Sequence, residues 1–95
     1  MLPQAARISA AYPNPFNAET IIEYHLSKAG TATLSVYDIT GRKVRELVSY
    51  FLPAGKNKAV WNRRDDSGRQ VSSGVYFARL TVGKHAAVEK MLLLK

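Results

Sequence analysis

Apolar and polar residues alternate along much of this chain with a period of two, the period of a β-strand that is buried on one face. The clearest example is residues 20–26, in which Ile22, Tyr24 and Leu26 share one face and the intervening residues share the other. No segment keeps apolar residues at the helical period of 3.6 for three turns. We therefore expect a chain built from strands, with essentially no helix.

The alternation predicts seven strands, separated by glycine, proline and aspartate: residues 7–11, 20–26, 31–39, 43–48, 56–62, 75–82 and 85–95. The first of them is short and weakly patterned. Strands of this length at a spacing of about ten residues, with turn residues between them, are typical of an antiparallel sandwich. The predicted fold class is all-β, an antiparallel immunoglobulin-like β-sandwich of about seven strands.

Turn residues between the strands have expected structural roles. Glycine adopts the positive φ that tight turns need, and an aspartate carboxylate accepts hydrogen bonds from the amides that follow it. Gly83 and Lys84 are expected to form a two-residue hairpin turn. The other predicted structural turns involve Asp38, Gly41, Gly55, Asp66, Gly68 and Gly74.

The length of 95 residues predicts one domain. We expect residues 1–11 to form a linker or boundary segment and residues 12–95 to form the sandwich. The chain has no cysteine, so it has no disulfide framework and no thiolate metal site. Residues 1–7 lack the features of a signal peptide, and no apolar run has the length of a transmembrane segment.

The net charge is +7, from 14 basic and 7 acidic residues. Such an excess favours contact with an anionic partner, such as nucleic acid, an acidic polysaccharide or a phosphorylated surface. It is also compatible with simple solubility, because basic residues commonly occupy the solvent faces and edges of sheets. The densest basic clusters, Arg42–Lys43 and Arg63–Arg64, flank turns expected at opposite ends of the sandwich. Nucleic-acid binding is therefore not expected.

Candidate catalytic chemistry is sparse. The chain has only two histidines, His25 and His85, and neither has a nucleophile or carboxylate at a spacing that predicts a catalytic group. Asp65 and Asp66 are adjacent, so their carboxylates point apart and do not match a calcium-binding loop. Trp61 is in phase with aliphatic neighbours, as is Tyr76, so both are predicted to be core aromatics rather than a sugar-binding platform. The sequence predicts neither an enzyme nor a cofactor.

A series of motifs does resemble a known family. The chain carries A-Y-P-N-P-F-N at positions 11–17, L-S-V-Y-D-I-T-G-R-K-V at 34–44, V-W-N at 60–62, D-D-S-G-R-Q-V-S-S-G-V-Y at 65–76 and K-M-L-L-L-K at 90–95. This order is similar to that of the type A C-terminal sorting domain of the type IX secretion system. The middle also resembles the immunoglobulin-like domain of the flagellar hook-capping protein. The two ends distinguish the families.

The resemblance implies a non-catalytic module at the C-terminal side of a secreted cargo domain in Bacteroidetes-type bacteria. It implies passage through the periplasm to an outer-membrane translocon, and delivery to the cell surface. A sortase-like protease typically cleaves before the domain, here upstream of Tyr12 and in or before residues 5–9, and links the cargo to anionic lipopolysaccharide. The domain-opening motif would be Tyr12, Pro13, Asn14, Pro15, Phe16 and Asn17. Translocon recognition would use Glu89, Lys90, Met91, Leu92, Leu93, Leu94 and Lys95.

The residues suggest how such recognition would work. Pro13 and Pro15 lack amide donors, so the opening motif is not expected to extend the sheet. If the last strand is an edge, a partner could bind it by strand addition while its other side completes the core. Two other functions remain open at this stage. One is a passive structural domain like the hook-capping module, and the other is binding of an anionic polysaccharide.

Overall fold

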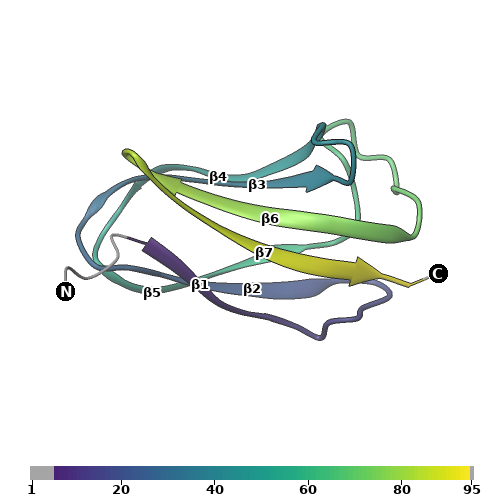
Figure 1. Cartoon of the computed structure of the whole chain (residues 1–95), viewed down its shortest axis with the longest axis horizontal. Coiled ribbons are helices and arrows are strands. Elements are labelled where there is room, and N and C mark those ends of the chain that lie inside the picture. The colour runs from purple at the N-terminus through teal and green to yellow at the C-terminus, as the bar shows by residue number, and fades with distance from the viewer. Residues whose placement is uncertain (1–5, 95) are drawn as a thin grey trace.

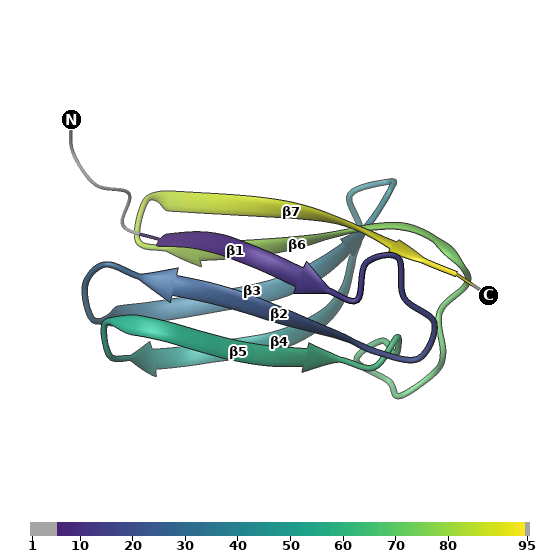
Figure 2. The same cartoon turned by 90° about the horizontal axis from the view of Figure 1, so that it is seen from below.

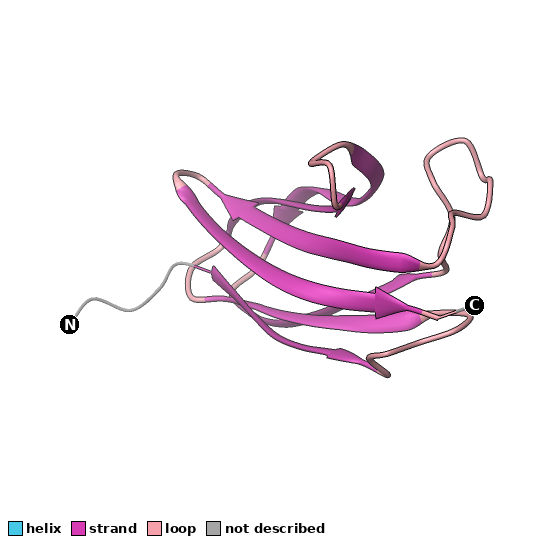
Figure 3. Ribbon diagram, turned by 45° about the vertical axis from the view of Figure 1, so that its right-hand side comes forward, coloured by secondary structure: helices cyan, strands magenta, loops and turns pink. Residues whose placement is uncertain are grey.

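The computed structural model describes residues 6–94, which form seven strands and no helix (Figures 1 and 3). The strands are β1 (Ala6–Tyr12), β2 (Thr20–Leu26), β3 (Gly30–Asp38), β4 (Lys43–Leu52), β5 (Gly55–Trp61), β6 (Gly74–Val82) and β7 (His85–Leu93). Within these described residues no helix has the length and hydropathy of a membrane span.

The strands form two antiparallel sheets that pack face to face as a sandwich. One sheet has the strand order β1-β2-β5 and the other has the order β4-β3-β6-β7. Figure 2 shows the three-stranded sheet in front of the four-stranded sheet, with the edge strands β1 and β7 lying along the same side. The predicted all-β sandwich is confirmed.

The period-two pattern places one face of each central strand in the core. In β2 the side chains of Ile22, Tyr24 and Leu26 are buried, as the alternation predicts. The same holds for alternate residues of β3 and β6, because cross-strand pairs such as Leu34 and Leu80 lie on the same face of the sheet. The Gly83–Lys84 hairpin also forms as expected, with Val82 paired to His85.

An aromatic cluster links the two sheets near the ends of β5 and β7. The indole of Trp61 is fully buried between two rings. The Phe16 ring lies 5.6 Å from it, centroid to centroid, and the Tyr76 ring lies 5.1 Å from it in an edge-on arrangement. The indole Nε1 donates a hydrogen bond to the carbonyl oxygen of Arg64 at 3.0 Å. The prediction that Trp61 and Tyr76 belong to the core is confirmed.

The boundary segment needs a correction. Residues 6–11 belong to β1, which pairs with β2 along its whole length, and the side chains of Ala6 and Ala11 are buried. The alternation is weak there because the register shifts between Ile8 and Ala10, which is the signature of a β-bulge. The linker expected over residues 1–11 therefore does not include residues 6–11, and residues 1–5 lie outside the described part of the chain.

Candidate functional site

The opening motif, Tyr12 to Asn17, lies against the outer edge of the last strand. Asn14 makes the first contact through its side chain: its Nδ2 donates to the carbonyl oxygen of Lys90 at 3.0 Å, and its Oδ1 accepts from the amide of Leu92 at 3.0 Å. One carboxamide thus satisfies two consecutive outward-facing groups of the β7 backbone, as a neighbouring strand would. We call this contact, between Asn14–Phe16 and residues 90–94, the junction.

Phe16 makes the second contact of the junction through its backbone. Its amide donates to the carbonyl oxygen of Leu92 at 3.0 Å, and its carbonyl oxygen accepts from the amide of Leu94 at 2.7 Å. These two bonds form an isolated parallel bridge between Phe16 and Leu93. The phenyl ring is almost completely buried against Trp61. Phe16 therefore fixes the opening motif to the core and to β7 at the same time.

The start of the opening motif is held by β2. The hydroxyl of Thr20, which is fully buried, donates to the carbonyl oxygen of Pro13 at 2.8 Å. The phenol of Tyr12 donates to Oε2 of Glu23 at 3.0 Å. The peptide bonds that precede Pro13 and Pro15 are both cis. The opening motif is thus an ordered part of the sandwich, and sequence reasoning missed its bonds to β7.

The junction corrects the expected mode of recognition. β7 is an edge strand in the strand order, as the strand-addition hypothesis requires. However, the outward backbone groups at Lys90, Leu92 and Leu94 already bond to Asn14 and Phe16. A partner strand would have to displace the opening motif, and Phe16 with it, from the core. Strand addition to this half of β7 is therefore not available in the folded domain.

The side chains of the last strand divide by face. Met91 and Leu93 are buried in the core, whereas Leu92 and Leu94 remain 37% and 42% exposed. Lys90 is exposed, and Glu89 is half-buried. Lys95, the last residue of the expected recognition segment, lies outside the described residues. Among residues 89–94, the most exposed side chains are therefore those of Lys90, Leu92 and Leu94.

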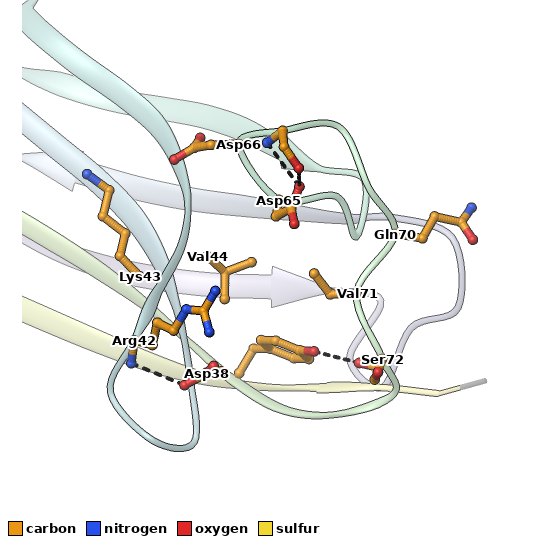
Figure 4. Close-up of a pocket in the computed structure, with 11 residues that line it drawn as sticks. Asp38, Arg42, Lys43, Val44, Asp65, Asp66, Gln70, Val71 and Ser72 are labelled. Atoms are coloured by element: carbon orange, nitrogen blue, oxygen red, sulfur yellow. Dashed lines mark hydrogen bonds between the residues drawn. The ribbon is translucent and has the colours of Figure 1, made fainter.

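A polar cleft of about 600 Å³ lies near one end of the sandwich, between the β3–β4 hairpin and the loop that precedes β6 (Figure 4). Asp38 lies at the hairpin side of this cleft. Its Oδ1 accepts three hydrogen bonds, from the amide and hydroxyl of Thr40 and from the amide of Arg42. Gly41 takes a φ of +86° in this turn. The Asp38 carboxylate therefore stabilises its own turn, as predicted.

The loop side of the cleft repeats this turn. Oδ1 of Asp65 accepts from the amide and hydroxyl of Ser67 and from the amide of Arg69, and Gly68 has a φ of +88°. Both turns share the pattern Asp-x-Ser/Thr-Gly-Arg, at positions 38–42 and 65–69. This repeated spacing was present in the sequence and would have identified Asp65 as the turn residue.

The prediction that the Asp66 side chain closes the turn by bonding to the amides that follow it is wrong. Its Oδ1 accepts from the amide of Glu46 at 3.0 Å, and its own amide donates to the carbonyl oxygen of Val44. Asp66 thus joins the loop to the edge of β4, while Asp65 closes the turn. The other predicted turn glycines, Gly55 and Gly74, both have a positive φ.

The two basic clusters lie nearer to each other than expected. The β3–β4 turn and the 62–73 loop face the same cleft, so Arg42–Lys43 and Arg63–Arg64 flank one end of the sandwich rather than opposite ends. The guanidinium of Arg63 donates to the carbonyl oxygens of Asn17 and Val71, and that of Arg64 donates to Gly68. Much of the positive charge in the loop therefore stabilises the loop itself.

The two turn aspartates predict an acid-dependent loss of stability. The pKa of Asp38 is lowered mainly by the hydrogen bond from the Thr40 hydroxyl. The pKa of Asp65 is lowered mainly by the hydrogen bond from the Ser67 hydroxyl. A lowered pKa contributes stability above the unfolded value of about 3.9, and that contribution is lost as the pH falls through the folded pKa. The double variant D38N/D65N should be less stable than the parent at pH 7, and the gap should narrow by pH 3. Urea titrations at both pH values measure this, and a gap independent of pH would contradict it.

Residues 10–94 match the model of the family described as the secretion system C-terminal sorting domain. No curated protein matches the chain. Over 99% of the chain, the fold superposes on dimeric latent PorU from Porphyromonas gingivalis with a TM-score of 0.80 at 19% identity.

Two other solved structures share the fold. PorZ, a surface component of the type IX secretion system of Porphyromonas gingivalis, superposes over 93% of the chain with a TM-score of 0.64 at 23% identity. A DNA glycosylase, AlkC from Pseudomonas fluorescens, superposes over 97% with a TM-score of 0.55 at 15% identity. The chain spans 10% of the PorU chain, 11% of the PorZ chain and 31% of the AlkC chain.

Proposed function

Because the chain belongs to the family of secretion system C-terminal sorting domains, we propose that it is a non-catalytic module that directs a secreted cargo through the type IX translocon to the cell surface. The observation that supports this proposal best is the junction. The two motifs that distinguish the sorting family from the hook-capping domain, 11–17 and 90–95, are far apart in sequence, yet Asn14 and Phe16 bond directly to β7. The sorting signal is then a folded surface rather than a linear tail.

The exposed side chains at the end of β7 form the contact surface in this proposal. Lys90, Leu92 and Leu94 face away from the core, while Met91 and Leu93 keep the strand in place. The translocon recognises those outward side chains without unfolding the strand. The opening motif contributes by fixing the position of the β7 backbone through Asn14.

The placement of β1 suggests where cargo and protease would act. β1 begins at the end of the long axis opposite to the junction (Figure 1), and the molecule is 40 Å long. A cargo domain upstream of β1 would therefore lie away from the recognition surface. Because residues 6–12 are paired with β2, a sortase-like protease would cut upstream of Ala6 rather than within this strand. Linkage of the released cargo to anionic lipopolysaccharide belongs to the same proposal.

A fusion experiment tests this function. Residues 1–95 are joined behind an exported fluorescent reporter in a bacterium that carries a type IX secretion system. The reporter should reach the cell surface, and the variant L92D/L94D should leave it in the periplasm, because two carboxylates then occupy an apolar contact. The readout is surface protease accessibility of the reporter.

The matched control for that fusion is Val60→Asp. Val60 is 50% exposed on the solvent face of β5, in the other sheet, so the substitution places a carboxylate on an exposed apolar position outside the junction. Circular dichroism of each purified domain establishes that the variants are folded. Surface delivery of a folded L92D/L94D variant at the parental level would refute recognition through these side chains.

A further inference from the structure

The solvent face of the four-stranded sheet carries a groove that the sorting motifs do not include. It has a volume of about 250 Å³ and is lined by Tyr37, Asp38, Ile39, Phe77, Arg79 and Val88. The residues come from β3, the turn that follows it, β6 and β7. Those in strands are neighbours by register: Tyr37 pairs with Phe77, and Arg79 pairs with Val88. We call this feature the outer groove.

The outer groove is unusually apolar for a solvent face. An antiparallel sheet normally presents polar residues on the side away from the core. Yet Ile39 is 73% exposed and Val88 is 58% exposed, beside the half-buried rings of Tyr37 and Phe77. An apolar cluster on the surface of a small domain usually marks a binding site.

The solvent face of the three-stranded sheet has a different composition. There, Arg7 pairs with His25 and His25 pairs with Lys56, and Glu23 pairs with Lys58 in the adjacent row. These two rows are polar, as is usual on the solvent face of an antiparallel sheet. That face also has one apolar row, in which Tyr12 pairs with Ile21 and Ile21 pairs with Val60. Unlike that row, the apolar residues of the outer groove line a cavity that also contains Arg79.

Positive charge borders the outer groove. Arg79 lines it, and Lys90 pairs with the lining residue Phe77 on the neighbouring strand. The ion pairs within residues 6–94 use other cations, namely Lys43, Arg45 and Lys58. The one carboxylate in the groove, that of Asp38, accepts hydrogen bonds within its own turn. The unpaired charge of the groove is therefore cationic.

We propose that the outer groove is a docking site for a partner protein segment that presents an apolar side chain flanked by carboxylates. The apolar side chain covers Val88 and Ile39, and the carboxylates pair with Arg79 and Lys90. A second copy of this chain fits poorly, because it carries only 7 acidic residues against 14 basic ones. A polysaccharide has no side chain that would cover the aliphatic groups.

This inference rests on the proposed function, because the groove is on the same sheet face as Leu92 and would extend the recognition surface beyond the junction. Val75 pairs with Leu92 and Phe77 pairs with Lys90, so the groove and the exposed side chains of β7 are continuous. The partner class is thereby specified as a secretion component with an acidic, apolar contact segment.

An in vitro test uses 8-anilinonaphthalene-1-sulfonate, a small apolar probe with one negative charge. The folded domain should bind one probe, and nuclear magnetic resonance shifts should map it to Tyr37, Phe77 and Val88. The variant V88D/R79E should weaken binding about tenfold, the factor that accompanies loss of about 1.4 kcal/mol. The control V60D/K56E likewise changes a valine and a basic residue to acidic ones, on the other sheet, and should bind like the parent. Shifts that map elsewhere, or equal loss in both variants, would overturn the assignment of the groove.

The reporter fusion described above completes the test. With V88D/R79E, surface delivery should fall about tenfold, while V60D/K56E should deliver normally. Normal delivery by a folded V88D/R79E variant would overturn the docking proposal and leave the proposed function intact. Failure of the parent fusion to reach the surface would instead refute the proposed function. If sedimentation shows that the parent is a dimer and that Val88→Asp makes it a monomer, a second copy is the occupant of the groove and the proposal is overturned.

Discussion

Removing residues 90–95 is expected to unfold the whole domain rather than simply delete a recognition tag. The deletion takes Met91 and Leu93 out of the core, where both side chains are almost completely buried. Truncating one such side chain to alanine costs about 2–5 kcal/mol, and a small domain has only about 5–15 kcal/mol of stability. Phe16 would also lose both backbone hydrogen bonds to β7.

The comparison of chain 1–89 with chain 1–95 by thermal circular dichroism measures this effect. The full chain should show a cooperative transition and the shortened chain should show none. The control is L92S/L94S, which changes the same segment but leaves Met91 and Leu93 in the core, and it should keep the transition. A cooperative transition of chain 1–89 near that of the parent would show that the last residues are dispensable for folding.

This expected result changes how secretion experiments with such domains are interpreted. Loss of export after a terminal deletion reports unfolding as much as loss of a contact. Substitutions at Leu92 and Leu94 separate the two effects, because these side chains lie on the opposite face of the strand from Met91 and Leu93. In the proposed function, recognition and folding therefore use different faces of one strand.

The elements that the sequence predicted well are those with strong local patterns. β2, β3 and β6 alternate regularly, so their inward faces were identified correctly, and the in-phase position of Trp61 and Tyr76 placed both in the core. β1 was underestimated because the bulge near Ser9 interrupts its period. A one-residue shift turns the side chains after the bulge to the other face, so buried and exposed residues of β1 do not alternate regularly along the sequence.

The junction could not be predicted for a different reason. Asn14 and its partner Lys90 are separated by 76 residues, and no local periodicity specifies a side chain that bonds to a distant strand. Phe16 stands alone among proline and asparagine residues, so nothing in its neighbourhood marks it as a core residue. The family resemblance singled out the two motifs, whereas their contact follows only from the packing of one sheet against the other.

Replacing Trp61 by alanine is expected to destabilise the domain by about 3–5 kcal/mol, the usual cost of removing a large buried aromatic side chain. Trp61 contacts Phe16 on one side and Tyr76 on the other, so its loss leaves a cavity between the opening motif and β6. For a domain of this size, that loss lowers the melting temperature by at least about 12 °C. Trp61→Phe should give an intermediate result, because it keeps an aromatic ring but loses the hydrogen bond to Arg64.

Urea denaturation followed by far-ultraviolet circular dichroism is the appropriate measurement, because Trp61 is the single tryptophan and its fluorescence disappears with it. Val60→Ala is the matched control: the residue is adjacent on β5 but half exposed, so the change should cost less than about 1 kcal/mol. If Trp61→Ala were no more costly than Val60→Ala, the aromatic cluster would not hold the opening motif in place. The position of Asn14 and Phe16 on β7 would then depend on their own hydrogen bonds alone.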